Sequence, residues 1–98
     1  MSVAVRYLEA EKIEELATQL RSEGYKVEAP DSVSRAPYDL VAKKGDEAIA
    51  IEVKALSALG GAVKEVSELR DRAHREGFTE FRLVVVSPPH TPRVAIQG

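Results

Sequence analysis

Apolar residues recur every three or four positions from about Glu9 to Glu23, which is the spacing of one buried helix face. The residues on that face are Ile13, Leu16, Ala17 and Leu20. Gly24 follows, and glycine is the usual residue just beyond the C-terminus of a helix. This stretch therefore predicts a first helix over residues 9–23.

Alternating and continuous apolar stretches predict four strands after this helix. They span Tyr25–Ala29, Tyr38–Lys43, Glu47–Ala55 and Glu80–Ser87. Only Lys44, Gly45 and Asp46 separate the second strand from the third, so these two strands are expected to form a hairpin. Residues 30–37 (PDSVSRAP) are rich in turn formers and predict an exposed loop. The last strand contains the run Leu83–Val86, which is typical of a strand covered on both faces.

A second helix is expected between the third and fourth strands. It would begin at Gly60 and Gly61 and run to about Glu76, with a buried face made of Val63, Val66, Leu69 and Ala73. A helix that connects two strands of one sheet makes them parallel through a right-handed crossover. The order αβββαβ therefore predicts an α/β protein with a mixed four-stranded sheet flanked by helices.

Length and composition add limits to this picture. The 98 residues, 44% hydrophobic and 31% charged, predict a single domain over residues 1–98, with an irregular proline-rich tail over 88–98. No apolar run approaches the roughly 20 residues of a membrane-spanning helix, and the first ten residues do not resemble a signal peptide, so we expect a cytoplasmic location. The net charge of −2 argues weakly against nucleic-acid binding, since proteins that grip phosphates are usually basic.

The predicted hairpin brings two acids and a lysine together. If it turns on Gly45 and Asp46, Asp39 lies directly opposite Glu52, and Lys54 projects from the same face two residues further on. Two facing carboxylates are destabilising unless positive charge lies between them, and a divalent cation and Lys54 both meet that need. The alternative interpretation is that Glu52 and Lys54 form a solvated strand face and that Asp39 merely begins a strand.

Any metal at this position must be held mainly by oxygen. The chain has no cysteine, and its two histidines, His74 and His90, are not spaced to share one metal. Hard oxygen ligands select Mg²⁺ or Mn²⁺, and magnesium typically binds through one or two carboxylates while it keeps waters and contacts substrate phosphate. The residues therefore predict a Mg²⁺ or Mn²⁺ site suited to phosphate chemistry.

Two segments, 37–42 (PYDLVA) and 51–54 (IEVK), resemble the PD-(D/E)xK signature of restriction endonucleases, archaeal Holliday-junction resolvases and related repair nucleases. The expected order of elements is that family's minimal core, so the resemblance covers nearly the whole chain and implies a restriction-endonuclease-like fold. It also implies a metal-dependent endonuclease, with DNA as the expected substrate. By position, Asp39, Glu52 and the backbone carbonyl of Val53 would bind the metal, and Lys54 would assist the nucleophilic water.

The sequence departs from this family pattern on the first helix. Many relatives carry a glutamate on its buried side, where this chain has Ile13. Glu9, one turn earlier, or Glu14 is the candidate replacement, and a solvated helix charge is the alternative for both. Another Pro-Asp pair, Pro30 and Asp31, lies in the turn-rich loop and lacks the apolar strand that follows Asp39.

Basic residues supply candidate phosphate contacts. These are Arg35 in the loop and Arg72 and Arg75 on the second helix, with solvated or ion-paired side chains as the alternative. A chain this small offers a short DNA footprint, so the nuclease hypothesis includes a homodimer or a subunit of a larger complex. The alternative hypothesis is a non-catalytic nuclease-like module that contacts protein or nucleic acid.

Overall fold

The computed structural model of the chain describes residues 3–28 and 37–88. In chain order its elements are α1 (Val3–Ser22), β1 (Lys26–Glu28), β2 (Leu40–Lys44), β3 (Glu47–Ala55), α2 (Leu56–Leu59), the 3₁₀ turn η1 (Gly60–Ala62), α3 (Val63–Arg75) and β4 (Glu80–Val86). The strands form one sheet in the order β1-β2-β3-β4. β1, β2 and β3 pair antiparallel, and β4 is parallel to β3. This confirms the α/β fold and its mixed four-stranded sheet.

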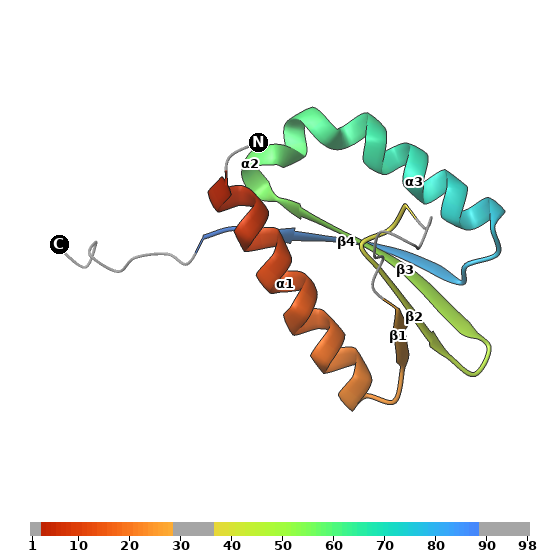
Figure 1. Cartoon of the computed structure of the whole chain (residues 1–98). Coiled ribbons are helices and arrows are strands. Elements are labelled where there is room, and N and C mark those ends of the chain that lie inside the picture. Colours follow the sequence, from red (N-terminus) through yellow and green to blue (C-terminus); the bar gives the residue numbers. More distant parts are fainter. Residues whose placement is uncertain (1–2, 29–36, 89–98) are drawn as a thin grey trace, which may run out of the picture.

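Helices cover the two faces of the sheet, with α1 on one side and α3 on the other (Figure 1). The core under α1 consists of Ala17, Leu20, Leu40, Ala42, Ile49, Ile51 and Val53, and a second core contains Tyr38, Val41, Ala50 and Ala73. The face of β3 that carries Glu52 and Lys54 is therefore not charged along its whole length. The second face is also apolar where α3 packs on it, and it carries charge only toward the end of the strand.

The β2–β3 hairpin has the register expected from the sequence, with Lys44 opposite Glu47 and Leu40 opposite Ile51. Gly45 supports the tight turn with a φ of 58°, a conformation that is open to glycine at little steric cost. β2 begins at Leu40 and not at the expected Tyr38. Asp39, just before the strand, bonds to β3 through its side chain and not through its backbone.

Two helix starts differ from the sequence prediction. α1 begins at Val3, six residues before the expected Glu9, because residues 3–8 contain no glycine or proline to interrupt the helix. The second helical segment begins at Leu56, directly after β3. Gly60 has helical dihedral angles (φ −58°, ψ −36°), so it continues this segment instead of starting it.

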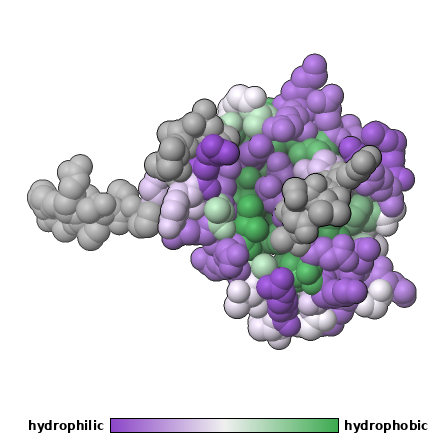
Figure 2. Space-filling model, viewed as in Figure 1, coloured by the Kyte–Doolittle hydropathy of each residue, from purple (hydrophilic) through white to green (hydrophobic). Residues whose placement is uncertain are grey.

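The prediction that the last strand is covered on both faces is wrong. β4 lies at an edge of the described sheet, and the side chains of Leu83 and Val85 are exposed. Val63 is exposed as well, against prediction, because its neighbour Ala62 takes the inward position at the start of α3. Figure 2 shows that some hydrophobic surface is visible in the central part of this view.

Two segments with sequence predictions fall outside the described residues. They are most of the expected loop, at residues 30–36, with Ala29 at the end of the expected first strand, and nearly all of the expected tail, at 89–98. Of the helices that the structure describes, none is long and apolar enough to cross a membrane.

Candidate active site

Two carboxylates bind the edge of β3 where β2 no longer reaches it. The last β2–β3 pair is Leu40 with Ile51. Beyond it, the backbone N–H of Val53 donates to Asp39 Oδ2 at 2.7 Å, and that of Ala55 donates to Glu9 Oε2, also at 2.7 Å. These acids thus take the place of the missing strand as acceptors.

The backbone carbonyl of Val53 points to the same edge of β3 as its N–H group. The N–H and C=O groups of one strand residue point to the same side, so the Val53 carbonyl lies on the side from which Asp39 accepts its hydrogen bond. A carboxylate and a carbonyl oxygen therefore face one edge of β3.

Glu52 is a nearly buried acid on the face of the sheet. The residue is only 5% exposed. Its Oε2 atom lies 3.5 Å from Lys54 Nζ, while Oε1 is buried and has no hydrogen-bond partner within the described part of the chain. A buried carboxylate oxygen without a donor is costly, so this atom marks a position for a proton or a cation.

Burial holds back the ionisation of both acids. Burial raises the pKa of Glu52 to about 7, the negative charge of Asp39 adds to the effect, and the charge of Lys54 opposes it. Burial also raises the pKa of Asp39, although the hydrogen bond from Val53 and the charge of Lys54 act in the other direction. Near neutral pH, and without a bound cation, Asp39 and Glu52 together therefore carry less than their full negative charge of −2.

Lys54 lies between two carboxylates. Its Nζ atom is 3.1 Å from Glu65 Oε1 on α3 and 3.5 Å from Glu52 Oε2. Burial lowers the pKa of the ammonium, but the hydrogen bond to Glu65 and the charges of Glu52 and Glu65 more than offset this, and the pKa is raised overall. Lys54 is therefore a protonated hydrogen-bond donor at neutral pH and not a base.

The structure thus brings together the side chains that the sequence singled out as a site. Asp39, Glu52 and Lys54 lie at one end of the hairpin, and Glu9 reaches this end from α1. Glu14, the other helix candidate, is exposed on α1. Glu65 was missed, because it follows Lys54 by eleven residues across α2 and η1, and no sequence spacing indicates that contact.

The candidate phosphate contacts on α3 have different environments. Arg72 Nε is paired with Glu76 Oε2 at 2.8 Å, as the ion-paired alternative expects, whereas Arg75 is exposed and forms no ion pair within the described residues. Arg35 lies outside the described residues.

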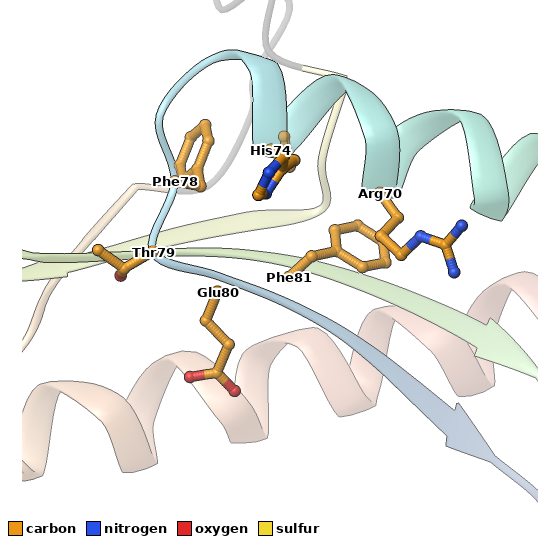
Figure 3. A pocket seen from close by; sticks show the side chains of 7 residues that line it. Arg70, His74, Phe78, Thr79, Glu80 and Phe81 are labelled. Atoms are coloured by element: carbon orange, nitrogen blue, oxygen red, sulfur yellow. The ribbon is translucent and has the colours of Figure 1, made fainter.

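Two hollows, of about 370 and 220 Å³, border α3 and share Arg70 and His74. Figure 3 shows both side chains extending from α3, and Phe78 and Phe81 line the smaller hollow with them. None of the acids described above lines either hollow. The hollows are therefore separate from the Asp39 and Glu52 site.

The carboxylate oxygens at the site are suitable ligands for a hard divalent cation that keeps some of its water ligands. Among residues 3–28 and 37–88, no group of three or more histidine, aspartate and glutamate side chains is arranged to hold a metal. Magnesium, however, commonly uses only one or two protein carboxylates. Asp39 and Glu52 supply two. The Oε1 atom of Glu52, which has no partner in the described part of the chain, is the kind of oxygen that such a cation would satisfy.

A mixed four-stranded sheet with helices on both faces, and with acids and a lysine at the end of its central hairpin, defines a restriction-endonuclease-like protein. The family model described as AHJR-like (REase_AHJR-like) matches residues 1–97. The chain therefore belongs to this restriction-endonuclease-like family, which confirms the resemblance found in the sequence. A search of curated proteins gives no match.

Proposed function

We propose that the protein is a metal-dependent nuclease that hydrolyses phosphodiester bonds of nucleic acid, with DNA as the expected substrate. The observation that carries the proposal is the state of Glu52, a buried carboxyl group beside Asp39. One of its oxygens has no partner among residues 3–28 and 37–88, and its pKa is raised to about 7. A cation bound between the two acids would reduce the repulsion between their carboxylates and would give the unsatisfied oxygen of Glu52 a partner. Membership of a restriction-endonuclease-like family supports the nuclease class.

Asp39, Glu52 and the Val53 carbonyl are the groups that would hold Mg²⁺ or Mn²⁺. Proteins of this class typically use divalent metals. When bound, such an ion supplies a water of lowered pKa and neutralises charge on the phosphate oxygens. Glu9 holds the backbone of Ala55 and so fixes the end of the strand that carries these ligands.

Lys54 supplies positive charge to the reacting phosphate. Because its ammonium is protonated, it donates hydrogen bonds to the attacking water or to a phosphate oxygen and does not remove a proton. Charge builds on the phosphate oxygens in the transition state, so a donor fixed at this position stabilises the transition state more than the bound substrate. Lys54 is thus the proposed catalytic cation of the site.

Arg75 and Arg35 are the proposed contacts to the nucleic-acid backbone, and Arg72 would have to leave Glu76 to join them. The small size of the chain leaves room for few such contacts. We therefore extend the proposal to a homodimer, or a subunit of a larger nuclease assembly, that works in the cytoplasm.

The proposal is tested by cleavage of plasmid, linear and branched DNA in the presence of manganese. Lys54→Ala should lower the cleavage rate by about 10²-fold or more. Lys64→Ala is the matched control, since Lys64 is exposed on α3 and forms no ion pair within the described residues. Equal cleavage by wild type and Lys54→Ala would identify a contaminant and remove the enzymatic proposal.

A second candidate function is a nuclease-like module that binds protein or nucleic acid without hydrolysis. The observation that favours it is that the described residues contain no cluster of three or more metal-binding side chains. Manganese titration separates the two functions. Saturable binding that Asp39→Ala abolishes supports the nuclease, whereas a wild-type protein that binds no manganese supports the module.

A further inference from the structure

Glu65 contacts Lys54 in addition to Glu52. Glu65 lies in the first turn of α3 and its side chain is 60% exposed, whereas the Lys54 side chain is 14% exposed. Lys54 is therefore a largely buried cation with one acid in the sheet and one acid in the helix above it. An ammonium group has three donors, so its position depends on the acceptors around it.

The two contacts of this ammonium are unequal. The distance from Nζ to Glu65 Oε1, 3.1 Å, is that of a hydrogen bond, whereas the distance to Glu52 Oε2, 3.5 Å, is an ion pair without a close hydrogen bond. Charge-assisted bonds between ammonium and carboxylate groups usually have lengths of about 2.7–2.9 Å. The Lys54 ammonium is thus closer to Glu65 than to Glu52. The Oε1 atom of Glu52 has no partner among the described residues.

We infer that Glu65 is a positioning residue that holds Lys54 toward α3 and so keeps the Glu52 carboxylate open to a divalent cation. The inference rests on the proposed function, because it assigns that cation to Glu52. Without Glu65, the nearest acid to Lys54 is Glu52, and a poorly exposed cation gains most from a close, complete pair. The lysine would then compete with the metal for the same oxygens.

This role is testable because the contact contributes little to folding. An ion pair with one exposed partner contributes at most about 1 kcal/mol, so Glu65→Ala should fold. Glu65→Gln keeps an oxygen acceptor for the ammonium but removes the charge. Glu68 is the control position, since it is exposed on the next turn of α3 and forms no ion pair within the described residues.

Manganese binding, measured by titration calorimetry on the metal-free protein, is the first readout. Glu65→Ala should weaken binding about tenfold, which corresponds to about 1.4 kcal/mol. Glu65→Gln should recover part of this loss, and Glu68→Ala should bind like wild type. Equal binding by wild type and Glu65→Ala would overturn the inference and leave the proposed function standing, whereas a wild type that binds no manganese would refute both.

A double-mutant cycle tests whether Glu65 acts through Lys54. Lys54→Ala should bind manganese at least as tightly as wild type, and adding Glu65→Ala to it should change binding less than about twofold, because no lysine remains to compete. A tenfold loss in that background as well would show that Glu65 acts through its own charge, which overturns the positioning role.

The crystal structure of metal-free Glu65→Ala is the second readout and needs no cation. The expected result is that Lys54 Nζ moves into hydrogen-bonding distance of the Glu52 carboxylate, at about 2.8 Å. A lysine that stays in its wild-type position would overturn the inference, because Glu65 would then have no part in placing it.

Discussion

The carboxylate of Glu9 and the backbone N–H of Ala55 are 46 residues apart in the chain and form a hydrogen bond of 2.7 Å. Glu9 belongs to α1, and Ala55 is the last residue of β3. The bond therefore ties the first helix to the end of the strand on which Glu52 and Lys54 lie. Glu9 therefore has a structural role next to the candidate metal ligands.

Removal of this acceptor should destabilise the fold. Glu9→Ala leaves the N–H of the buried Ala55 without a partner, so the free energy of unfolding should fall by about 1–3 kcal/mol. Glu9→Gln retains an oxygen acceptor and should cost less. Urea unfolding measures both, with Glu14→Ala as the control on an exposed position of α1, where less than about 0.5 kcal/mol is expected. Equal losses in Glu9→Ala and Glu14→Ala would contradict the assigned bond.

Glu52 should make the metal-free protein less stable as pH rises. Its pKa is about 7 in the folded protein against an ordinary 4.5, so folding favours the protonated form. The stabilisation is complete below about pH 4.5 and is lost as pH rises through 7, and Asp39 acts in the same direction. The shift of Glu52 sets an upper limit of roughly 3.5 kcal/mol on its contribution, because one pKa unit corresponds to about 1.4 kcal/mol.

The pH effect is measured by urea unfolding between pH 4.5 and 8 in a metal chelator. Glu52→Gln should flatten the decline, so the slope of stability against pH is the quantity to compare, and not stability at one pH. Glu68→Gln, at an exposed position, should keep the wild-type slope. Identical slopes in wild type and Glu52→Gln would show that Glu52 ionises normally.

Metal should restore the stability that the acid pair loses. At pH 7.5, manganese at a hundred times its Kd should stabilise the wild type by about 2.7 kcal/mol. Asp39→Asn should lose this gain, although its amide oxygen can still accept the bond from Val53 that Asp39 accepts in the wild type. Asp46→Asn, in the exposed hairpin turn, is the matched control. Thermal unfolding with and without manganese decides the outcome, and full stabilisation of Asp39→Asn would argue against Asp39 as a ligand.

A buried residue of β2 and an exposed residue of β4 should respond differently to truncation. Leu40 is completely buried under α1, so Leu40→Ala should cost about 2–5 kcal/mol. Leu83 is exposed on β4, so Leu83→Ala should cost well under half of that. Denaturant unfolding compares them directly. A comparable cost for Leu83→Ala would mean that another surface covers this edge in solution.

Much of the site could be predicted from local sequence patterns. The short turn at Gly45 and the two-residue period of a strand together determine which hairpin residues face one another, and the structure has that register. The same alternation places Glu52 and Lys54 on one face, where they form an ion pair. A tight turn leaves few alternative pairings, so sequence alone was sufficient for this part.

Contacts between distant segments required the tertiary structure. Helical periodicity does not say how far along the sheet α1 lies, and only its packing brings Glu9, and not Glu14, to Ala55. In the same way, the path through α2 and η1 sets which α3 residue meets Lys54.

The amino-acid sequence by itself determined the order of elements, the hairpin register and the grouping of Asp39, Glu52 and Lys54, because each depends on residues close together in the chain. Only the tertiary structure decided that β4 lies at an edge with Leu83 exposed, and that Glu65 shares the lysine with Glu52. The physical reason is that periodicity specifies which face of an element is apolar, whereas the neighbour that meets this face depends on the packing of the whole chain.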